Sequence, residues 1–280
     1  MKSDYEYNNG LNQFSAFSEL NRYVMIDTVD RCENDSDLIE AINETKKKQY
    51  IVFEDEIKGF DRIEEETTNI IVSKKRSFEA AKEYKGKKIA VLNFANNHVI
   101  GGSPFSSGAQ EESICRLSTL YPCLQKEKER YYKYHEKLYN TGRLTNFGND
   151  DLIYSPDIVV FKSDESAPKI LKKEDWFTVD VITSCAPEMQ KSSPIVYNEE
   201  KVFNRLMKVF EVAKRENVEV LILGAWGCGA FNNPPEKTAL FFKKLTKMYK
   251  FDTIEFAVFC RDGGIDANYH IFKEVILNES

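Results

Sequence analysis

Histidines, closely spaced cysteines and long apolar runs are all scarce in this sequence. Only three histidines accompany six cysteines, and the cysteines lie far apart, with no Cys-x-x-Cys pair. Because zinc sites are built from closely spaced ligands, we expect no metal and no cofactor. The cysteines do not indicate a disulfide framework either, since such frameworks are typical of shorter, secreted chains.

No segment has the composition of a signal peptide or a membrane span. The first residues, MKSDYEYNNG, contain no apolar stretch, and no later run approaches about 18 uncharged apolar residues. We therefore expect a reduced, cytoplasmic protein that does not bind a membrane. The formal net charge of −6 argues against direct binding of nucleic acid, which requires a basic surface. A ligand that carries phosphate would have to be held by local features such as backbone amides.

The length and composition indicate an ordinary globular protein. With 280 residues and 42% hydrophobic content, the chain can bury a large core. We predict a single domain over residues 1–280, in which 1–85 form an N-terminal accessory region of helices and strands and 86–280 form the core. In the first part, 50–53 and 69–72 have the composition of short strands, and 74–85 have helical apolar spacing with Gly86 as a stop signal.

From residue 88 onward, short β-rich runs alternate with helical segments. Most of the predicted strands are largely apolar, which indicates a sheet covered by helices on both faces. Ligands of such sheets bind beyond the carboxyl ends of the strands, so the loops after Phe94, Thr183 and Leu223 are the candidate site. The predicted strands are 89–94, 158–161, 177–183, 218–223 and 254–259, and the predicted helices are 110–121, 126–139, 200–217, 236–249 and 268–277.

A pair of glutamates follows a glycine loop. Gly101-Gly102 precedes a predicted helix that opens with Gln110-Glu111-Glu112. Acidic residues in a first helical turn often only stabilise the helix, because unpaired amides and the helix dipole favour negative charge there. Here the helix starts beyond a strand end, the glycines permit close approach of a ligand, and Asn96-Asn97 lie in the same connection, which together predict a pocket. Adjacent helical residues point about 100° apart, so the two carboxylates would have different roles.

A second glycine-rich turn follows the buried strand that ends at Leu223. Such turns can form amide nests for phosphate, although glycines also serve tight turns without any ligand. Phe231, at the end of the turn, is either a core residue or a stacking surface for a nucleobase. Cys185, in the small-residue turn after 177–183, has no neighbouring histidine in sequence, so we predict a structural role for it. The turn consists of Gly224, Ala225, Trp226, Gly227, Cys228, Gly229, Ala230 and Phe231.

Together these segments resemble the microbial-type poly(ADP-ribose) glycohydrolase (PARG) family. The resemblance covers most of 75–280 in the family's order, and the Gln-Glu-Glu run and the glycine-rich turn are its most specific parts. It implies a three-layer α/β/α macrodomain with a mixed central sheet. The matching stretches are VLNFANNHVIGGSPFSSGAQEESICRLSTLYPCL (91–124), VDVITSCAP (179–187), LILGAWGCGAFNNPPE (221–236) and IEFAVF (254–259).

The resemblance also implies a role for each matching position. Glu112 would be the general acid and base that protonates the leaving oxygen at the ribose–ribose bond and then assists water, and Glu111 would orient the ribose. Asn96 would contact the distal ribose. Residues 224–230 would bind the diphosphate, and Phe231 would pack on ribose or adenine.

The glycine loop departs from the family pattern. The family has three consecutive glycines before Gln-Glu-Glu, whereas this chain has only Gly101 and Gly102, with either Ile100 or Ser103 in place of the third. A side chain there disfavours positive φ, most strongly at the β-branched Ile100, and adds bulk near the ligand.

Three hypotheses follow for the function. The first is a glycosidase that releases ADP-ribose from poly(ADP-ribose), including polymer on ADP-ribosylated proteins, and that works as a monomer. The second is a non-catalytic ADP-ribose-binding macrodomain or a mono-ADP-ribosyl hydrolase, and the third is a structural α/β protein in which these motifs arise by chance.

Overall fold

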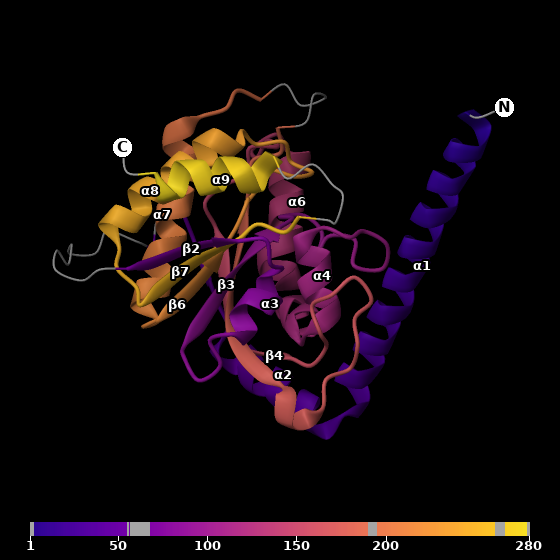
Figure 1. The fold of residues 1–280 in the computed structure, drawn as a ribbon. Coiled ribbons are helices and arrows are strands. Elements are labelled where there is room, and N and C mark those ends of the chain that lie inside the picture. Colours follow the sequence, from indigo (N-terminus) through magenta and orange to yellow (C-terminus); the bar gives the residue numbers. More distant parts are fainter. Residues whose placement is uncertain (1–2, 55, 57–67, 190–194, 261–266, 279–280) are drawn as a thin grey trace.

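The computed structural model describes residues 3–54, 56, 68–189, 195–260 and 267–278, and for 3–15 it describes the backbone alone. It is a mixed α/β structure in which helices cover both faces of a central sheet (Figure 1), as the sequence predicts. The strands are β1 (Tyr50–Val52), β2 (Asn69–Ser73), β3 (Ile89–Ala95), β4 (Leu152–Val160), β5 (Phe177–Cys185), β6 (Val220–Leu223) and β7 (Thr253–Ala257).

The helical elements vary widely in length, and the first of them is the longest. Figure 1 shows α1 beside the body of the molecule, with its N-terminal end projecting beyond it. The helices are α1 (Ser3–Asn34), α2 (Ser36–Lys48), α3 (Ser77–Lys82), α4 (Gln110–Leu117), α5 (Leu120–Leu124), α6 (Lys133–Asn140), α7 (Glu199–Arg215), α8 (Pro235–Met248) and α9 (Ala267–Leu277), with short turns η1 (Gln125–Glu127), η2 (Lys128–Tyr132) and η3 (Lys173–Asp175).

The sheet has seven strands in the order β1-β4-β5-β3-β6-β7-β2. The neighbours β5, β3, β6, β7 and β2 run parallel, whereas β1 and β4 run antiparallel to the strands beside them. The carboxyl ends of β3, β5 and β6 therefore meet at one edge of the sheet. This arrangement brings together the loops that the sequence singled out.

Two hydrophobic clusters fill the space on either side of the sheet. Along β3, Ala90 and Leu92 pack with α7, α8 and α9, whereas Ile89 and Val91 pack with α2, α3, α4 and α5. This alternation follows from the two-residue period of a strand. Both faces of the central strands are thus buried, which explains why the sequences of β3 and β6 are almost wholly apolar.

The N-terminal part of the chain supplies both edges of the sheet. Strand β1 pairs with β4 at one edge, and β2 pairs with β7 at the other. The predicted strands at 50–53 and 69–72 are present to within a residue. The division at residue 85 between an accessory region and a core stays a prediction.

Two of the predicted elements differ from the structure for local reasons. Strand β4 begins at Leu152, six residues before the predicted start. Proline is unusual within a strand, so Pro156 kept the sequence pattern from indicating the first half of β4. There the register shifts between Ser155 and Ile158, and Asp157 has φ +55°. The helix predicted at 110–121 stops at Leu117, because Ser118 leaves the helical conformation and forms a bridge with Val160.

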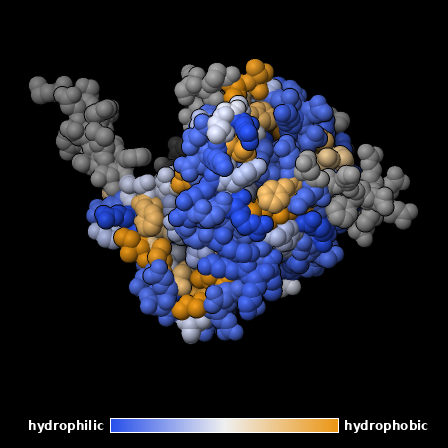
Figure 2. All heavy atoms as spheres, turned by 180° about the vertical axis from the view of Figure 1, so that it is seen from behind, coloured by the Kyte–Doolittle hydropathy of each residue, from blue (hydrophilic) through white to orange (hydrophobic). Residues whose placement is uncertain are grey.

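The surface is mostly polar. Figure 2, which views the molecule from behind, shows hydrophilic residues over most of this face, with scattered hydrophobic patches. Among the described residues, no helix is long and apolar enough to cross a membrane.

Candidate active site

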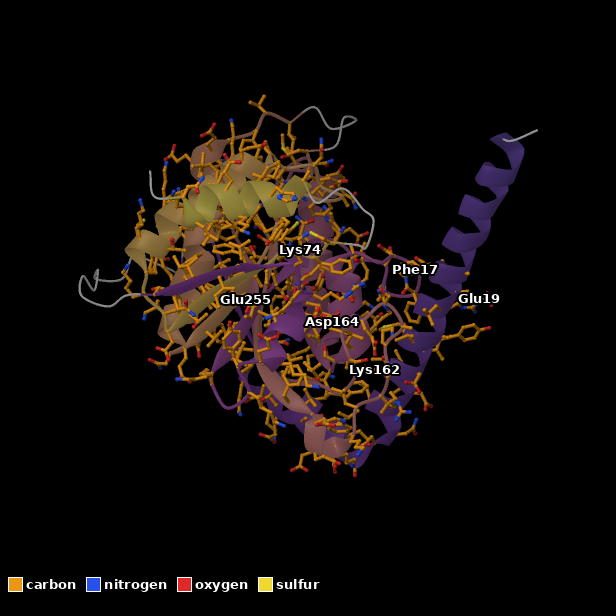
Figure 3. The ribbon with its side chains drawn as sticks, in the orientation of Figure 1. Phe17, Glu19, Lys74, Lys162, Asp164 and Glu255 are labelled. Atoms are coloured by element: carbon orange, nitrogen blue, oxygen red, sulfur yellow. The ribbon has the colours of Figure 1, made fainter. Side chains whose placement is uncertain are left out.

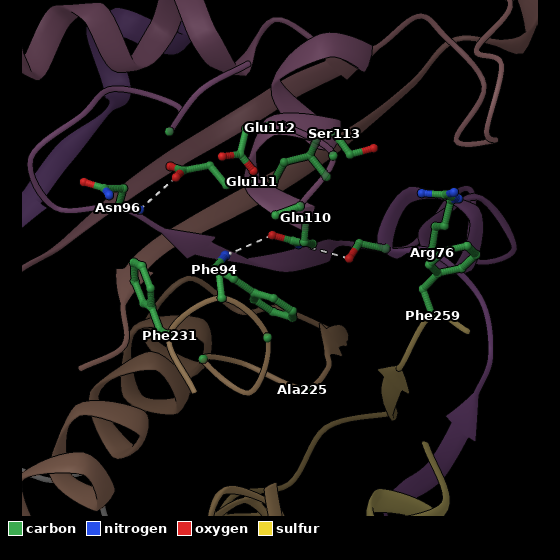
Figure 4. Close-up of a pocket in the computed structure, with 18 of the residues that line it drawn as sticks. Arg76, Phe94, Asn96, Gln110, Glu111, Glu112, Ser113, Ala225, Phe231 and Phe259 are labelled. Atoms are coloured by element: carbon green, nitrogen blue, oxygen red, sulfur yellow. Dashed lines mark hydrogen bonds between the residues drawn. The ribbon is translucent and has the colours of Figure 1, made fainter. Parts of the chain in front are cut away.

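A cavity of about 390 Å³ opens at the carboxyl edge of the central strands. Its walls come from the loop between β3 and α4 (96–109), from the first turns of α4, and from the turn after β6 (224–231). Figure 4 shows Gln110, Glu111 and Glu112 on one side of this cavity, facing Phe231 and Ala225 on the other.

Gln110 fastens the start of α4 to the sheet. Its Oε1 accepts a hydrogen bond from the amide of Phe94 (2.9 Å), and its Nε2 donates to the carbonyl of Leu92 (2.9 Å) and to Ser77 Oγ (3.0 Å). The side chain thus bonds β3 as a neighbouring strand would. The first residue of the Gln-Glu-Glu run fixes where the following two carboxylates lie.

Glu111 is almost fully buried, with 3% of its surface exposed. Its Oε2 accepts from the amide of Asn96 (2.7 Å), and its Oε1 accepts from Asn93 Nδ2 (3.3 Å), a side chain that also donates to Thr183 Oγ1 (3.2 Å). Burial raises the pKa of Glu111 well above its usual value, and the neighbouring charge of Glu112 adds to that rise.

Glu112 lies beside Glu111 with 9% of its surface exposed. Its Oε1 accepts a hydrogen bond from the amide of Ser103 (3.1 Å). The backbone of Gly102 passes directly over both carboxylates, because a Cβ at this position would overlap Glu112 Oε1 and lie 3.1 Å from Glu111 Oε2. Only glycine fits here without displacing the pair.

The two loop glycines both adopt the left-handed conformation, with φ +68° at Gly101 and +64° at Gly102. The backbone of Gly101 packs closely against the side chains of Tyr121 and Cys115. The small size of this glycine therefore serves packing inside the protein. Neither Ile100 nor Ser103 has a positive φ. The missing third glycine therefore puts no left-handed strain on either of the residues that replace it.

Asn96 is held in a tight turn at the carboxyl end of β3. Its Oδ1 accepts from the amides of His98 (2.8 Å) and Val99 (2.9 Å). The residue lines the cavity, whereas Asn97 is buried beside it and does not.

The turn after β6 is shaped by close backbone packing. A Cβ on Gly224 would lie 2.6 Å from the carbonyl oxygen of Ala257, and one on Gly227 would lie 2.5 Å from Ala186 Cβ. Gly229, in contrast, has no heavy atom within 4 Å of its Cβ position. Among the described residues, the amides of Gly227 and Gly229 donate to no other group, and both residues line the cavity.

Most of the predicted site residues meet at this cavity, but four do not line it. Trp226 is fully buried and donates from Nε1 to the carbonyl of Ser184 (2.9 Å), so its indole belongs to the core. The other three are Gly101, Gly224 and Cys228. The predicted residues that do line the cavity are Asn96, Gly102, Gln110, Glu111, Glu112, Ala225, Gly227, Gly229, Ala230 and Phe231.

Cys185 lies under the site and not in it. Burial raises the pKa of its thiol to about 12, so the thiol stays protonated at neutral pH and is a poor nucleophile. Among the described residues, no group of three or more His, Cys, Asp or Glu side chains is arranged to hold a metal ion.

The far end of the cavity contains residues that the sequence analysis missed. The guanidinium of Arg76 lies over the ring of Phe259, 3.8 Å from its centroid, and Asp164 lines the cavity nearby. Burial raises the pKa of Asp164 to about 6. These residues come from three distant parts of the chain, so no local motif could have identified them. The only signal was that Phe259 is the last residue of the strand predicted at 254–259.

Comparisons with known proteins agree with the geometry. Residues 25–163 match the family model for the microbial-type PARG catalytic domain, which confirms the predicted resemblance. This match includes the glycine loop and the glutamate pair, whereas the turn after β6 lies beyond it. No curated protein matches the sequence significantly.

Solved structures match nearly the whole chain. The poly(ADP-ribose) glycohydrolase of Thermomonospora curvata is 24% identical with a TM-score of 0.77, and the match covers 91% of this chain and 98% of that one. A structure of the glycohydrolase from that organism bound to the inhibitor ADP-HPD is 26% identical with a TM-score of 0.75, and the match covers 91% of this chain and 98% of that one. The glycohydrolase of Deinococcus radiodurans in complex with ADP-ribose is 26% identical with a TM-score of 0.72, over 84% of this chain and 97% of that one.

Proposed function

We propose that this relative of the microbial-type poly(ADP-ribose) glycohydrolases hydrolyses the ribose–ribose O-glycosidic bond of poly(ADP-ribose) and releases ADP-ribose. One observation carries the proposal: two adjacent carboxylates lie under the backbone of Gly102, at the wall of a cavity that is also lined by Gly227 and Gly229, whose amides donate to no other described group. Carboxylates serve glycoside cleavage, and backbone amides of this kind bind phosphate. The finer description of the fold as a macrodomain is part of the same proposal.

The two carboxylates divide the work. Glu112 donates a proton to the leaving ribose oxygen as the C1–O bond breaks, and it then takes a proton from the water that attacks C1. Glu111, held by the amide of Asn96 and by Asn93, accepts hydrogen bonds from ribose hydroxyls. Burial and the neighbouring charge of Glu112 raise the pKa of Glu111, so Glu111 retains a proton at a higher pH than an isolated glutamate would.

The rest of the cavity fits the rest of ADP-ribose. The diphosphate binds at the turn after β6, and the ring of Phe231 packs on the distal ribose. Asn96 contacts the same ribose through its side-chain Nδ2, because its Oδ1 already accepts from two amides. The Phe259 end of the cavity offers a flat aromatic surface for the base. The Deinococcus and Thermomonospora proteins have been solved in complex with ADP-ribose or ADP-HPD, which supports ADP-ribose as the ligand.

Two alternative functions use the same cavity: a mono-ADP-ribosyl hydrolase and a non-catalytic ADP-ribose-binding module. The missing third glycine is the feature that favours the non-catalytic module. The ordinary backbone conformations of Ile100 and Ser103, and the hydrogen bond from Ser103 to Glu112, favour an enzyme instead.

The test is incubation of the protein with poly(ADP-ribose), beside mono-ADP-ribosylated protein, followed by chromatography of the products. We expect free ADP-ribose from the polymer, and Glu112→Ala and Glu112→Gln should each lower its rate of release by about 10²- to 10⁴-fold. Calorimetry should show that ADP-ribose still binds to both variants. Glu129→Ala, which removes an exposed carboxylate on η2, is the matched control and should retain full activity.

Full activity in Glu112→Ala would contradict the proposal. Binding of ADP-ribose without hydrolysis of either substrate would select the binding module, and release from the mono-ADP-ribosylated protein alone would select the mono-ADP-ribosyl hydrolase.

We further propose that the protein works as a cytoplasmic monomer. Support comes from the sequence, in which the cysteines are widely spaced and follow no disulfide pattern. Light scattering of the purified protein and fractionation of the cells that produce it would test the two parts separately.

A further inference from the structure

Helix α1 contacts the glycine loop from behind, although no described residue of α1 lines the cavity. Asn21, which is 5% exposed, donates from Nδ2 to the carbonyl oxygens of Ser106 (3.0 Å) and Ser107 (3.2 Å). A side-chain amide that is buried this deeply needs hydrogen-bond partners, because a buried amide without them would lower the stability of the fold.

These bonds are the first link of a hydrogen-bonded chain that ends at the proposed acid. The amides of Ser106 (3.0 Å) and Ser107 (2.9 Å) both donate to the carbonyl of Ser103, and the amide of Ser103 donates to Glu112 Oε1 (3.1 Å). A displacement of the loop at Ser106 or Ser107 would therefore move the amide of Ser103, which bonds Glu112.

Phe17 makes a second contact four residues earlier on the same helix. A Cβ on Gly108 would lie 2.5 Å from Phe17 Cε1 and 2.9 Å from its Cζ. Gly108 itself lines the cavity. The ring of Phe17 thus backs the cavity wall directly, and Figure 3 labels it on α1 beside the body of the molecule.

The described part of α1 is itself firmly attached. Lys162, which is 2% exposed, donates from Nζ to the carbonyl of Val24 (2.8 Å) and to Thr28 Oγ1 (2.6 Å), and it pairs with Asp27 (2.7 Å). Thr28 Oγ1 also donates to the carbonyl of Arg116 (2.5 Å). Figure 3 shows Lys162 and, two residues later, the cavity residue Asp164.

Arg116 completes the attachment from α4. Its Nη1 donates to the carbonyls of Pro104 (2.8 Å) and Ser107 (2.6 Å), so Ser107 is bonded by α1 and α4 together. Asn21 and Arg116 hold the loop from two sides.

We propose that Asn21 and Phe17 are positioning residues that hold loop 103–109 in the conformation needed for substrate binding and for the contact with Glu112. The predicted effects on catalysis rest on the proposed function, whereas the effects on the loop do not. In this view α1 helps to complete a site whose loop has only two of the three glycines that the family pattern contains.

The first test compares Asn21→Ala and Asn21→Asp with Asn34→Ala. Asn34 lies on the same helix and is exposed, and within the part of the chain that the structure describes its side chain bonds only Asp30 of that helix. We expect amide hydrogen exchange in 103–108 to accelerate about tenfold in Asn21→Ala, with kcat/KM for polymer lower by a similar factor. Asn21→Asp keeps the shape but turns a carboxylate toward two carbonyl oxygens, so its loss should be at least as large.

Asn34→Ala should leave loop exchange and kcat/KM unchanged. If Asn21→Asp matches the wild type in loop exchange, Asn21 only fills space and the proposal is overturned. If the wild type hydrolyses no ADP-ribosyl substrate, the proposed function fails, but the exchange comparison still tests the loop attachment.

The second test uses a compensating pair. Gly108→Ala should disturb the loop because its Cβ meets the Phe17 ring, and Phe17→Ala should loosen the loop by removing that ring. In the double variant the new methyl group occupies space that the ring has left, so loop exchange and ADP-ribose affinity should recover relative to Gly108→Ala alone.

Tyr23→Ala is the control for Phe17→Ala, because Tyr23 is an aromatic residue of the same helix that is 62% exposed, and among the described residues it bonds only Glu19. It should behave as the wild type. Strictly additive losses in the double variant would overturn the assignment of Phe17.

Discussion

Two loops face each other across the cavity, and they are built in opposite ways. The loop after β3 is held by side chains of α4. Glu111 and Glu112 accept hydrogen bonds from the loop amides of Asn96 and Ser103, and Gln110 accepts one from the amide of Phe94 in β3. The turn after β6 is held by glycines that press against the backbone of Ala257 and the side chain of Ala186. The first loop leads into the helix that carries the acidic groups, and the second offers uncharged amides.

The difference indicates how labour is divided within the site. A loop held by side chains can place carboxylates in environments that shift their protonation, which acid and base chemistry requires. A turn packed through its backbone can hold an anion without any cation, which suits a protein of net charge −6. Substitutions in the first loop should therefore impair the reaction, and substitutions in the second should impair folding or binding.

Among substitutions in the two loops, the largest expected effect is that of Gly102→Ala. The new Cβ would overlap Glu112 Oε1 and crowd Glu111, at a position with φ +64°, so both carboxylates must move. We expect the rate of ADP-ribose release to fall by about 10²-fold or more, since small misplacements of reacting groups have effects of this size. Chromatography of released ADP-ribose measures it. Wild-type turnover in this variant would mean that the loop yields freely, and the comparison between the loops would break down.

A matched pair in the other loop should separate folding from binding. Gly224→Ala places a methyl group 2.6 Å from the Ala257 carbonyl oxygen and should lower the free energy of unfolding by about 1–3 kcal/mol. Gly229→Ala has open space around its Cβ, so thermal unfolding should stay unchanged while ADP-ribose affinity falls about tenfold as the methyl group crowds the diphosphate. Equal melting temperatures and equal affinities in the two variants would contradict this assignment.

The smallest expected effect concerns pH and Glu111. Its pKa in the folded protein is raised above the unfolded value, so the stability it contributes is present below pH 4.5 and is lost as the pH rises through the folded pKa. Glu111→Gln does not titrate, so its melting temperature should fall less than that of the wild type between about pH 5 and about pH 8.

The turn after β6 provides the contrast for this pH effect. Its one ionisable group is Cys228, whose pKa is raised to about 12 by burial. The melting temperature of Gly229→Ala should therefore change with pH in the same way as that of the wild type. Identical pH profiles for Glu111→Gln and the wild type would show that Glu111 titrates normally.

The sequence was sufficient for the features that depend on local pattern. Alternating apolar runs predicted the central strands, and the glycine loop, Gln110 and the glutamate pair were recognised because they lie close together in the chain. The features that the sequence did not predict depend on contacts between distant parts of the chain. The first half of β4 was hidden by Pro156, and the sequence patterns could not show that α1 extends to Asn34 and packs behind the glycine loop.

The site shows the same limit. Trp226 lies within a recognisable glycine-rich turn, yet its indole points into the core, because the turn curls around it and Ser184 provides a carbonyl acceptor. Arg76 and Phe259 meet only because β2 and β7 are neighbours in the sheet. Pairing between strands distant in sequence decides such contacts, and one sequence read alone does not reveal it.

The placement of β1 and β2 at the two outer edges of the sheet has a consequence for synthesis. Asn69 of β2 pairs with Thr253 of β7. Strand β2 is therefore synthesised early but cannot pair until nearly the whole chain has left the ribosome. Until then its backbone groups are exposed to other nascent chains, which favours aggregation. Loss of β7 by premature termination would leave β2 without a neighbour and β6 with β3 alone, so truncated chains should be removed by proteolysis instead of accumulating as partly active protein.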